Sequence, residues 1–246
     1  MKFIIGKKIG MTQKYQQSGA SVPVTEIRVE PCCVVQVKTK DNDGYASLQL
    51  GCGTSKHINK PGRGHLKDKK FSFLKEFRIQ ETDKDKFKVG DIISITNFIA
   101  GDIIAVTGIS KGMGFQGVVK RHGFKGQPST HGHKDQERMP GASGAGGKQH
   151  VFPGKRMPGR MGGSQITVQN LEMIEVDEKS NAMFIKGAVP GPTNSMVWLK
   201  GIGEISIVPK ADEVKSEAIK PQETASVAPA EVKPEVQPTE EKKESK

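Results

Sequence analysis

The most informative stretch of the sequence is KGMGFQGVVKRHGFKGQPSTHGHKDQERMPGASGAGGKQHVFPGKRMPGRMGG, residues 111–163. It holds ten Lys or Arg residues against two acids, fourteen of the 29 glycines and four of the six histidines. Its apolar residues are too few and too scattered to bury one face, so packing cannot hold the segment in shape. A long, basic, Gly-rich segment needs a binding partner to hold it in one shape, and the phosphate backbone of a nucleic acid matches its charge.

The sequence on both sides of this stretch predicts β-strands. Short runs rich in Val, Ile or Thr alternate with turn residues, as in SVPVTEIRVE and CCVVQVKTK before it and in SQITVQNLEMIEVD and NAMFIKGAV after it. KEFRIQ, FKVGDIISITNF, DIIAVTGIS, SMVWLK and GEISIVPK continue the series. Many short strands without a long helical period predict a mainly β protein, either a closed β-barrel or a sandwich. The closed barrel is favoured because closure leaves no unpaired strand edge.

The order of the segments predicts one barrel domain with additions. Residues 1–110 and 164–210 form the barrel, with an irregular basic insertion at 51–76. Residues 111–163 are a long irregular extension inserted between strands, because about 45 residues after it make a poor independent core. FQGVVKRHGF predicts one short helix at the base of this extension. The tail 211–246 has nine acids, six lysines and few apolar residues, a composition typical of disorder.

Composition narrows the partner. The 246 residues carry a net charge of +11, which rises to about +14 for residues 1–210 when the acidic tail is set aside. Such a balance favours nucleic acid or an anionic membrane. No run reaches the roughly 18 apolar residues of a membrane-spanning helix, so a membrane partner is not expected. Three cysteines, two of them adjacent, do not make a disulfide framework and indicate a reduced, cytoplasmic protein.

Two sequence motifs open other interpretations. GMGFQG, residues 112–117, matches the GxGxxG of nucleotide-binding enzymes, but that fold needs a helix and a second parallel strand after it. The acid at a suitable distance, Asp135, lies in irregular cationic sequence. The glycines fit better as places where backbone lies close against a polyanion. A DNA-binding architectural protein is a further alternative, although an irregular loop suits RNA cavities better than a regular groove.

The histidines and cysteines suggest a metal site only weakly. His122, His131, His133 and His150 are close in sequence, but no cysteine or carboxylate joins them at a recognised spacing. Imidazoles in a basic loop also stack on or hydrogen-bond to RNA. Cys32, Cys33 and Cys52, even with His57 and His65, match no standard zinc spacing and are expected to be small buried hydrophobes. We therefore expect no metal, no cofactor, no small-molecule substrate and no catalytic site.

Several sequence blocks resemble one known family. GKKIGMTQKY, SVPVTEIRVE, TGISKGMGFQGVVKRHGF, STHGH, RMPGASG, VFPGKRMPGRMGG, TVQNLEMIEVD and IKGAVPGPTNSMVWLK occur in the order found in the bacterial large-subunit ribosomal protein L-three family. The resemblance, over about residues 1–208, implies a β-barrel of the kind also seen in translation factors. It implies a structural protein, not an enzyme, in the cytoplasmic ribosome. It further implies direct binding to the 3′ part of the large-subunit rRNA, contact with neighbouring large-subunit proteins, a role in early subunit assembly, and an extension that reaches toward the peptidyl transferase centre.

The candidate binding residues lie in the extension. Those expected to contact rRNA are Lys111, Lys120, Arg121, His122, Lys125, His131, His133, Lys134, Arg138, Lys148, Lys155, Arg156 and Arg160. Among them Arg138, Lys155, Arg156 and Arg160 are expected to reach deepest, because cations on flexible, Gly-flanked backbone fit irregular RNA grooves. The resemblance implies that the tip nearest the peptidyl transferase centre contains Pro140, Gly141, Ala142, Ser143, Gly144, Gly147 and Gln149. A merely solvated charged face would not explain why these cations coincide with Gly and Pro and lack acidic partners.

Overall fold

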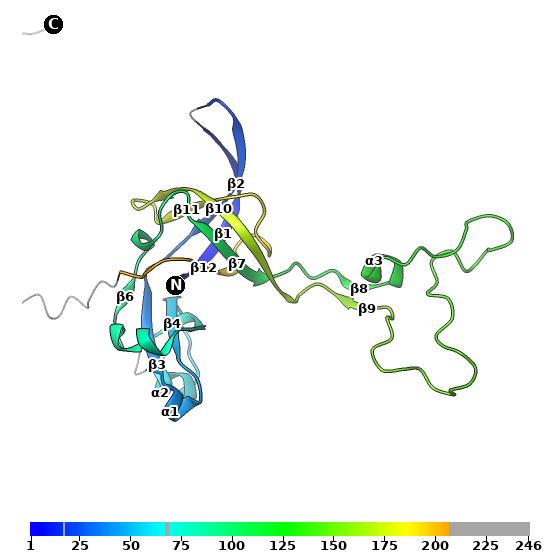
Figure 1. Ribbon diagram of the computed structural model, residues 1–246, viewed down its shortest axis with the longest axis horizontal. Coiled ribbons are helices and arrows are strands. Elements are labelled where there is room, and N and C mark those ends of the chain that lie inside the picture. The colour runs from blue at the N-terminus through cyan, green and yellow to red at the C-terminus, as the bar shows by residue number, and fades with distance from the viewer. Residues whose placement is uncertain (17, 67–68, 207–246) are drawn as a thin grey trace, which may run out of the picture. The chain divides into compact units, whose positions relative to one another are not determined.

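The computed structural model describes residues 1–206 except 17, 67 and 68. Six antiparallel strands close into a barrel in the order β1-β12-β7-β10-β11-β2 (Figure 1). These strands are β1 (Lys2–Tyr15), β2 (Ser21–Arg28), β7 (Ile103–Ile109), β10 (Gln165–Asp177), β11 (Ala182–Lys186) and β12 (Met196–Gly201). The predicted mainly β fold with a closed barrel is confirmed.

Long strands allow the sheet to close. The first half of β1 pairs with β12, from Lys2 to Lys7, and its second half pairs with β2, from Lys7 to Tyr15. A register shift between Lys8 and Gly10 separates the two halves, and such irregularities bend a strand and increase its twist. Strand β10 is used in the same way, with β7 along its first part and β11 along its second.

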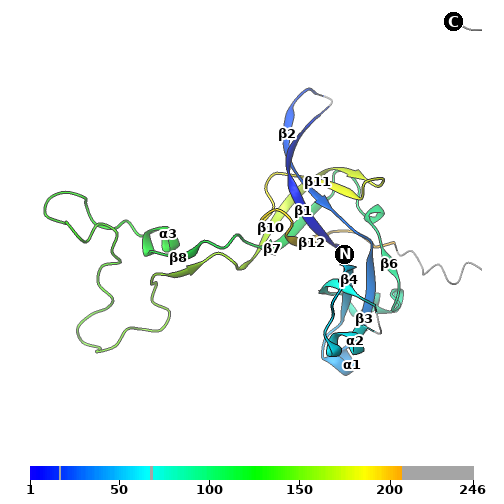
Figure 2. The same cartoon turned by 180° about the vertical axis from the view of Figure 1, so that it is seen from behind.

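The strands that lie between β2 and β7 in the sequence form a second, four-stranded sheet. The prediction that they belong to the barrel is therefore wrong. The order of this sheet is β5-β4-β3-β6, from β3 (Cys32–Lys38), β4 (Ser47–Thr54), β5 (Phe71–Arg78) and β6 (Ile92–Ile93) (Figure 2). Helix α1 (Lys40–Asp43) joins β3 to β4, and α2 (Lys60–Leu66) lies between β4 and β5. The irregular insertion predicted at 51–76 is therefore wrong at both ends, where β4 finishes and β5 begins.

Two further strand predictions are corrected. FKVGDIISITNF contributes only the two-residue β6, with the 3-10 helices η1 (Glu81–Lys86) before it and η2 (Ile95–Asn97) after it. In GEISIVPK, residues 203–206 are not in a strand, and residues 207–210 lie outside the described residues. The tail predicted at 211–246 also lies outside them.

One hydrophobic core joins the barrel to the second sheet. Phe3 of β1 and Phe77 of β5 stack with ring centroids 4.7 Å apart, and both are almost fully buried. Consecutive residues Phe3, Ile4 and Ile5 are all buried, although neighbours in a strand point to opposite faces. Both faces of β1 are therefore covered at this point, and none of the described residues of 111–163 belongs to this core.

Candidate nucleic-acid interface

The basic extension leaves the barrel after β7 and returns to it at β10, which are hydrogen-bonded neighbours. Its base contains β8 (Gly114–Gln116), the short helix α3 (Val118–His122) and β9 (Gly159–Met161), and β8 and β9 pair antiparallel. The predicted short helix is thus present. Between α3 and β9 the chain forms no helix or strand, and Figures 1 and 2 show it opening into irregular loops beyond the paired base.

Backbone contacts hold the two sides of the base together. The Ser110 N–H donates to the carbonyl oxygen of Ser164 at 2.9 Å, and the Met113 N–H donates to that of Met161 at 2.9 Å. Gly162 has a φ of 74°, and a Cβ at this position would overlap the carbonyl oxygen of Lys111. Glycine is needed here both for its left-handed conformation and for this close approach.

Two predicted RNA-binding side chains also bond within the base. Arg121 Nη1 donates to the carbonyl oxygen of Met157 at 2.7 Å. His122 Nε2 lies 3.0 Å from the same oxygen, which can only accept, so the tautomer with hydrogen on Nε2 donates. The sequence could not reveal this function of Arg121 and His122, because their partner lies 36 and 35 residues away along the chain.

The irregular part has sparse internal contacts. The Gln127 N–H donates to the carbonyl oxygen of Glu137 at 2.9 Å, which closes one loop. Lys148 Nζ lies 4.9 Å from the centroid of the Phe152 ring. Phe152 is itself half exposed, so this contact adds no core. Residues 140–158 are all exposed, including every predicted tip residue.

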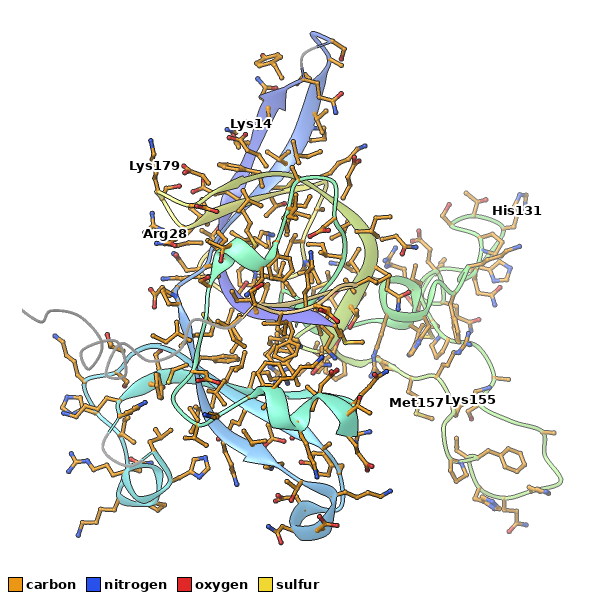
Figure 3. The ribbon with its side chains drawn as sticks, turned by 60° about the vertical axis from the view of Figure 1, so that its left-hand side comes forward. Lys14, Arg28, His131, Lys155, Met157 and Lys179 are labelled. Atoms are coloured by element: carbon orange, nitrogen blue, oxygen red, sulfur yellow. The ribbon has the colours of Figure 1, made fainter. Side chains whose placement is uncertain are left out.

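Most of the predicted cations of the extension are exposed, and none of them has an acidic partner among the described residues. Among the described residues, every ion pair between oppositely charged side chains lies outside residues 111–163. Figure 3 shows His131 and Lys155 at separate places on the extension. Arg121, His122 and His133 are half-buried, and the remaining predicted residues are exposed, namely Lys111, Lys120, Lys125, His131, Lys134, Arg138, Lys148, Lys155, Arg156 and Arg160.

Lys8 of β1 bonds to the loop between β11 and β12, close to the start of the extension. Its Nζ donates to the carbonyl oxygens of Val189 at 2.7 Å and Gly191 at 3.1 Å. Burial lowers the pKa of Lys8, and the positive charge of Lys111 lowers this pKa further. The charges of Lys8 and Lys111 therefore lie close enough to repel each other where the extension meets the barrel.

The alternative site types find no support in the geometry. Residues 112–117 contain β8, which pairs antiparallel with β9. A dinucleotide site instead needs a strand-to-helix turn in a parallel sheet. In the part of the chain that the structure describes, no three His, Cys, Asp or Glu side chains are grouped to hold a metal ion. Cys32 and Cys52 are buried and Cys33 is half-buried. None of the described helices has the length and apolar character needed to cross a membrane.

Fold and site together define a class of protein: a β-barrel with its own core that carries an exposed, cationic extension suited to a polyanion. The sequence profile of the family Ribosomal protein L3 matches residues 79–183. The large ribosomal subunit protein uL3 of Shouchella clausii is 46% identical over 202 residues, which cover 81% of this chain and 97% of that protein. The uL3 protein of Heliobacterium modesticaldum is 45% identical over 202 residues, with 81% and 96% covered, and that of Bacillus mycoides is 43% identical over 210 residues, with 83% and 99% covered.

The chain belongs to the ribosomal protein L3 family. Members of this family are structural components of the large ribosomal subunit, not enzymes. The resemblance seen in the sequence blocks and the location it implied, in the cytoplasm within the ribosome, are confirmed by this membership.

Proposed function

We propose that this protein binds large-subunit rRNA directly through the extension, supports early assembly of the subunit and braces RNA near the peptidyl transferase centre. One observation carries the proposal. The extension presents ten Lys or Arg residues that form no ion pair with an acid among the described residues, on a backbone with almost no core of its own. A phosphate backbone would supply the negative charge that these cations lack and a surface that holds the extension in one shape.

The barrel and the extension have different parts in this function. The barrel folds around its own core and fixes the two ends of the extension at β7 and β10. The irregular loops then follow the RNA surface, with Arg138, Lys155, Arg156 and Arg160 contacting phosphates. The tip acts on the peptidyl transferase centre indirectly, by supporting RNA. Partners are the 3′ part of the large-subunit rRNA and neighbouring proteins of the subunit.

The salt dependence of RNA binding tests the proposal. The test variant is Lys155→Gln/Arg156→Gln/Arg160→Gln in the full chain. Its control is Lys14→Gln/Lys40→Gln/Lys186→Gln, which removes the same charge from lysines that are paired with acids. The plot of log K, where K is the RNA association constant, against log salt concentration falls less steeply by about 0.7–0.9 for each phosphate contact that is lost. Raising the salt from 50 to 200 mM weakens RNA binding by wild type and by the test variant. We expect this weakening to be about 20- to 40-fold smaller for the test variant.

The outcome of this titration is decisive. The ligand is a transcript of the 3′ part of the large-subunit rRNA, with duplex DNA as competitor. Equal slopes for the test and control variants would refute rRNA binding by the extension. Competition by duplex DNA as strong as that by the transcript would instead favour a general DNA-binding protein.

A further inference from the structure

Two of the three cysteines face each other across the second sheet. Strands β3 and β4 pair antiparallel, with Val34 opposite Leu50. Two residues further along in the same register, Cys32 is opposite Cys52, so the two cysteines share a face of the sheet with that pair. All four side chains belong to the hydrophobic core, where Cys52 is only 3% exposed.

The separation of this pair suits a disulfide bond. Residues directly opposite each other in an antiparallel pair have Cα atoms about 4.5–5.5 Å apart and Cβ atoms about 4.5–5.5 Å apart. A disulfide joins residues whose Cα atoms are about 4.4–6.8 Å apart and whose Cβ atoms are about 3.5–4.5 Å apart. Cys32 and Cys52 are both free thiols in this structure. A small approach of their Cβ atoms, by about 1 Å, is enough to let the two sulfur atoms bond.

The two thiols already interact. They hydrogen-bond to each other, which raises the pKa of Cys32 and lowers the pKa of Cys52. Burial raises the pKa of Cys32 further. The sulfur of Cys32 also lies 3.7 Å from the carbonyl oxygen of Ile5 and 3.4 Å from that of Glu30. Cys52 is therefore the thiol that ionises more readily to the nucleophilic thiolate, and Cys32 is held beside it.

Cys52 is also the thiol that a small molecule can reach. It lines a cavity of about 400 Å³. The lining of this cavity includes Lys7, Arg28 and Thr54, which are exposed, so the cavity opens to solvent. A water molecule takes up about 30 Å³ in the liquid, and hydrogen peroxide, only a little larger, fits this space.

Cys33 lies outside this pair, although it is the neighbour of Cys32. Adjacent residues of a strand point to opposite faces of the sheet, and Cys33 is half-buried where Cys32 is buried. Its sulfur lies 3.4 Å from Lys69 Nζ. Cys33 therefore provides a matched control, because it is a thiol on the same strand that faces away from Cys52.

We propose that Cys32 and Cys52 form a redox-sensitive dithiol that a peroxide oxidises to a disulfide between β3 and β4. The Cys52 thiolate attacks one oxygen of hydrogen peroxide, the O–O bond breaks, and the hydroxide that leaves takes up the proton lost by Cys52. The Cys32 sulfur then attacks the sulfur of the Cys52 sulfenic acid, the S–O bond breaks, and hydroxide leaves with the Cys32 proton as a second water. Two thiols thus lose two electrons, and one peroxide is reduced to two waters. This chemistry is independent of RNA binding by the extension.

The disulfide would stabilise the second sheet. It closes the chain between Cys32 and Cys52 into a loop that contains α1. Such a cross-link stabilises a fold mainly by restricting the unfolded chain. We therefore expect oxidation to raise the midpoint of thermal unfolding by about 5–10 °C, and dithiothreitol to reverse this rise.

The test treats the reduced full chain with hydrogen peroxide in the absence of denaturant. Remaining thiols are alkylated, and tryptic peptides are mapped by mass spectrometry without reduction. Cys32 and Cys33 lie in peptide 29–38 and Cys52 lies in peptide 41–56, and fragmentation shows which of the adjacent cysteines is alkylated. We expect the two peptides to be linked through Cys32 and Cys52, with Cys33 alkylated.

Three variants separate the functions of the cysteines. Cys33→Ser should keep the link and the rise in the unfolding midpoint, whereas Cys52→Ser should lose both. In Cys32→Ser, which lacks the second thiol, dimedone should label a sulfenic acid on Cys52.

Several results with the wild-type chain would overturn the proposal, whether or not each variant folds. A link through Cys33, or oxidation of Cys33 alone, would show that the exposed face of β3 reacts instead. A link between Cys32 and Cys52 that forms only in denaturant would show that the folded sheet does not bring the two sulfur atoms together. Oxidation of Cys52 to a sulfinic acid without any link would have the same meaning.

Discussion

Substitution of Gly162 by alanine should open the base of the extension. An alanine with a φ near 74° pays about 1–2 kcal/mol for the left-handed conformation. Its Cβ would also overlap the carbonyl oxygen of Lys111, so the backbone must move. That movement breaks the hydrogen bond from Met113 to Met161, at a cost of about 1 kcal/mol. We therefore expect the closed base to be destabilised by about 2–3 kcal/mol in total.

Gly163→Ala is the matched control, because Gly163 has a φ of 66° but its nearest atom to an added Cβ is Arg160 Nη2, 3.6 Å away. It should cost only the conformational part, about 1–2 kcal/mol. Hydrogen exchange followed by mass spectrometry measures opening of the base directly. Protection of the Met113 amide should fall about 100-fold in Gly162→Ala and about tenfold in Gly163→Ala. Equal losses in the two variants would refute the close approach of Gly162 to Lys111.

Two further predictions concern the barrel and the tip. Asp102→Asn should lower the free energy of unfolding by about 1 kcal/mol at pH 7, because Lys2 Nζ lies 2.9 Å from Asp102. Burial raises the pKa of Asp102, but the Ile99 N–H and Lys2 outweigh it, so the pKa lies below its usual value. The stabilisation is thus fully present at neutral pH, begins to decline near pH 4 and is lost as the pH falls through the lowered pKa. Denaturant unfolding that shows the same difference between the two proteins at pH 7 and at pH 3 would contradict this. Deletion of residues 140–149 should leave thermal unfolding of the barrel unchanged but alter subunit assembly or antibiotic response, and wild-type behaviour in both would count against the bracing role.

The sequence predicts the strands well because each strand carries its own local pattern. At the start of β2, the buried Val22 and Val24 alternate with the exposed Ser21 and Pro23, as expected for a strand covered on one face. The pattern does not say which strands share a sheet. That is why β3 and β4 were assigned to the barrel, although hydrogen bonds place them in the second sheet.

The end of β4 was missed for a specific physical reason. A Cβ on Gly51 would lie 2.6 Å from the ring of Phe71 on β5, so close packing between these strands requires glycine. In a sequence, however, Gly51 and Gly53 are typical of loops. The prediction of an irregular insertion at 51–76 follows from this ambiguity.

The charge of the candidate site was predictable, but its internal bonds were not. Lack of nearby acids in sequence indicated that the cations of the extension are unpaired, and the described structure agrees. The bonds of Arg121 and His122 to Met157 join residues 36 and 35 positions apart. No local pattern encodes such a pairing, because it exists only once β8 and β9 have come together.

Several cations of the described barrel and second sheet differ from those of the extension in their partners. In the barrel and second sheet, Lys2, Lys38 and Lys186 are paired with acids, and Lys75 lies 4.2 Å from the centroid of the Trp198 ring. The extension has no such acid pair among the described residues. Holding an irregular backbone in one shape costs about 1–2 kcal/mol per residue, and the sparse contacts of the extension cannot offset that cost. Phosphate contacts can, and they weaken with salt. Barrel stability should therefore respond mainly to denaturant, whereas the shape of the extension should depend on bound RNA and on ionic strength.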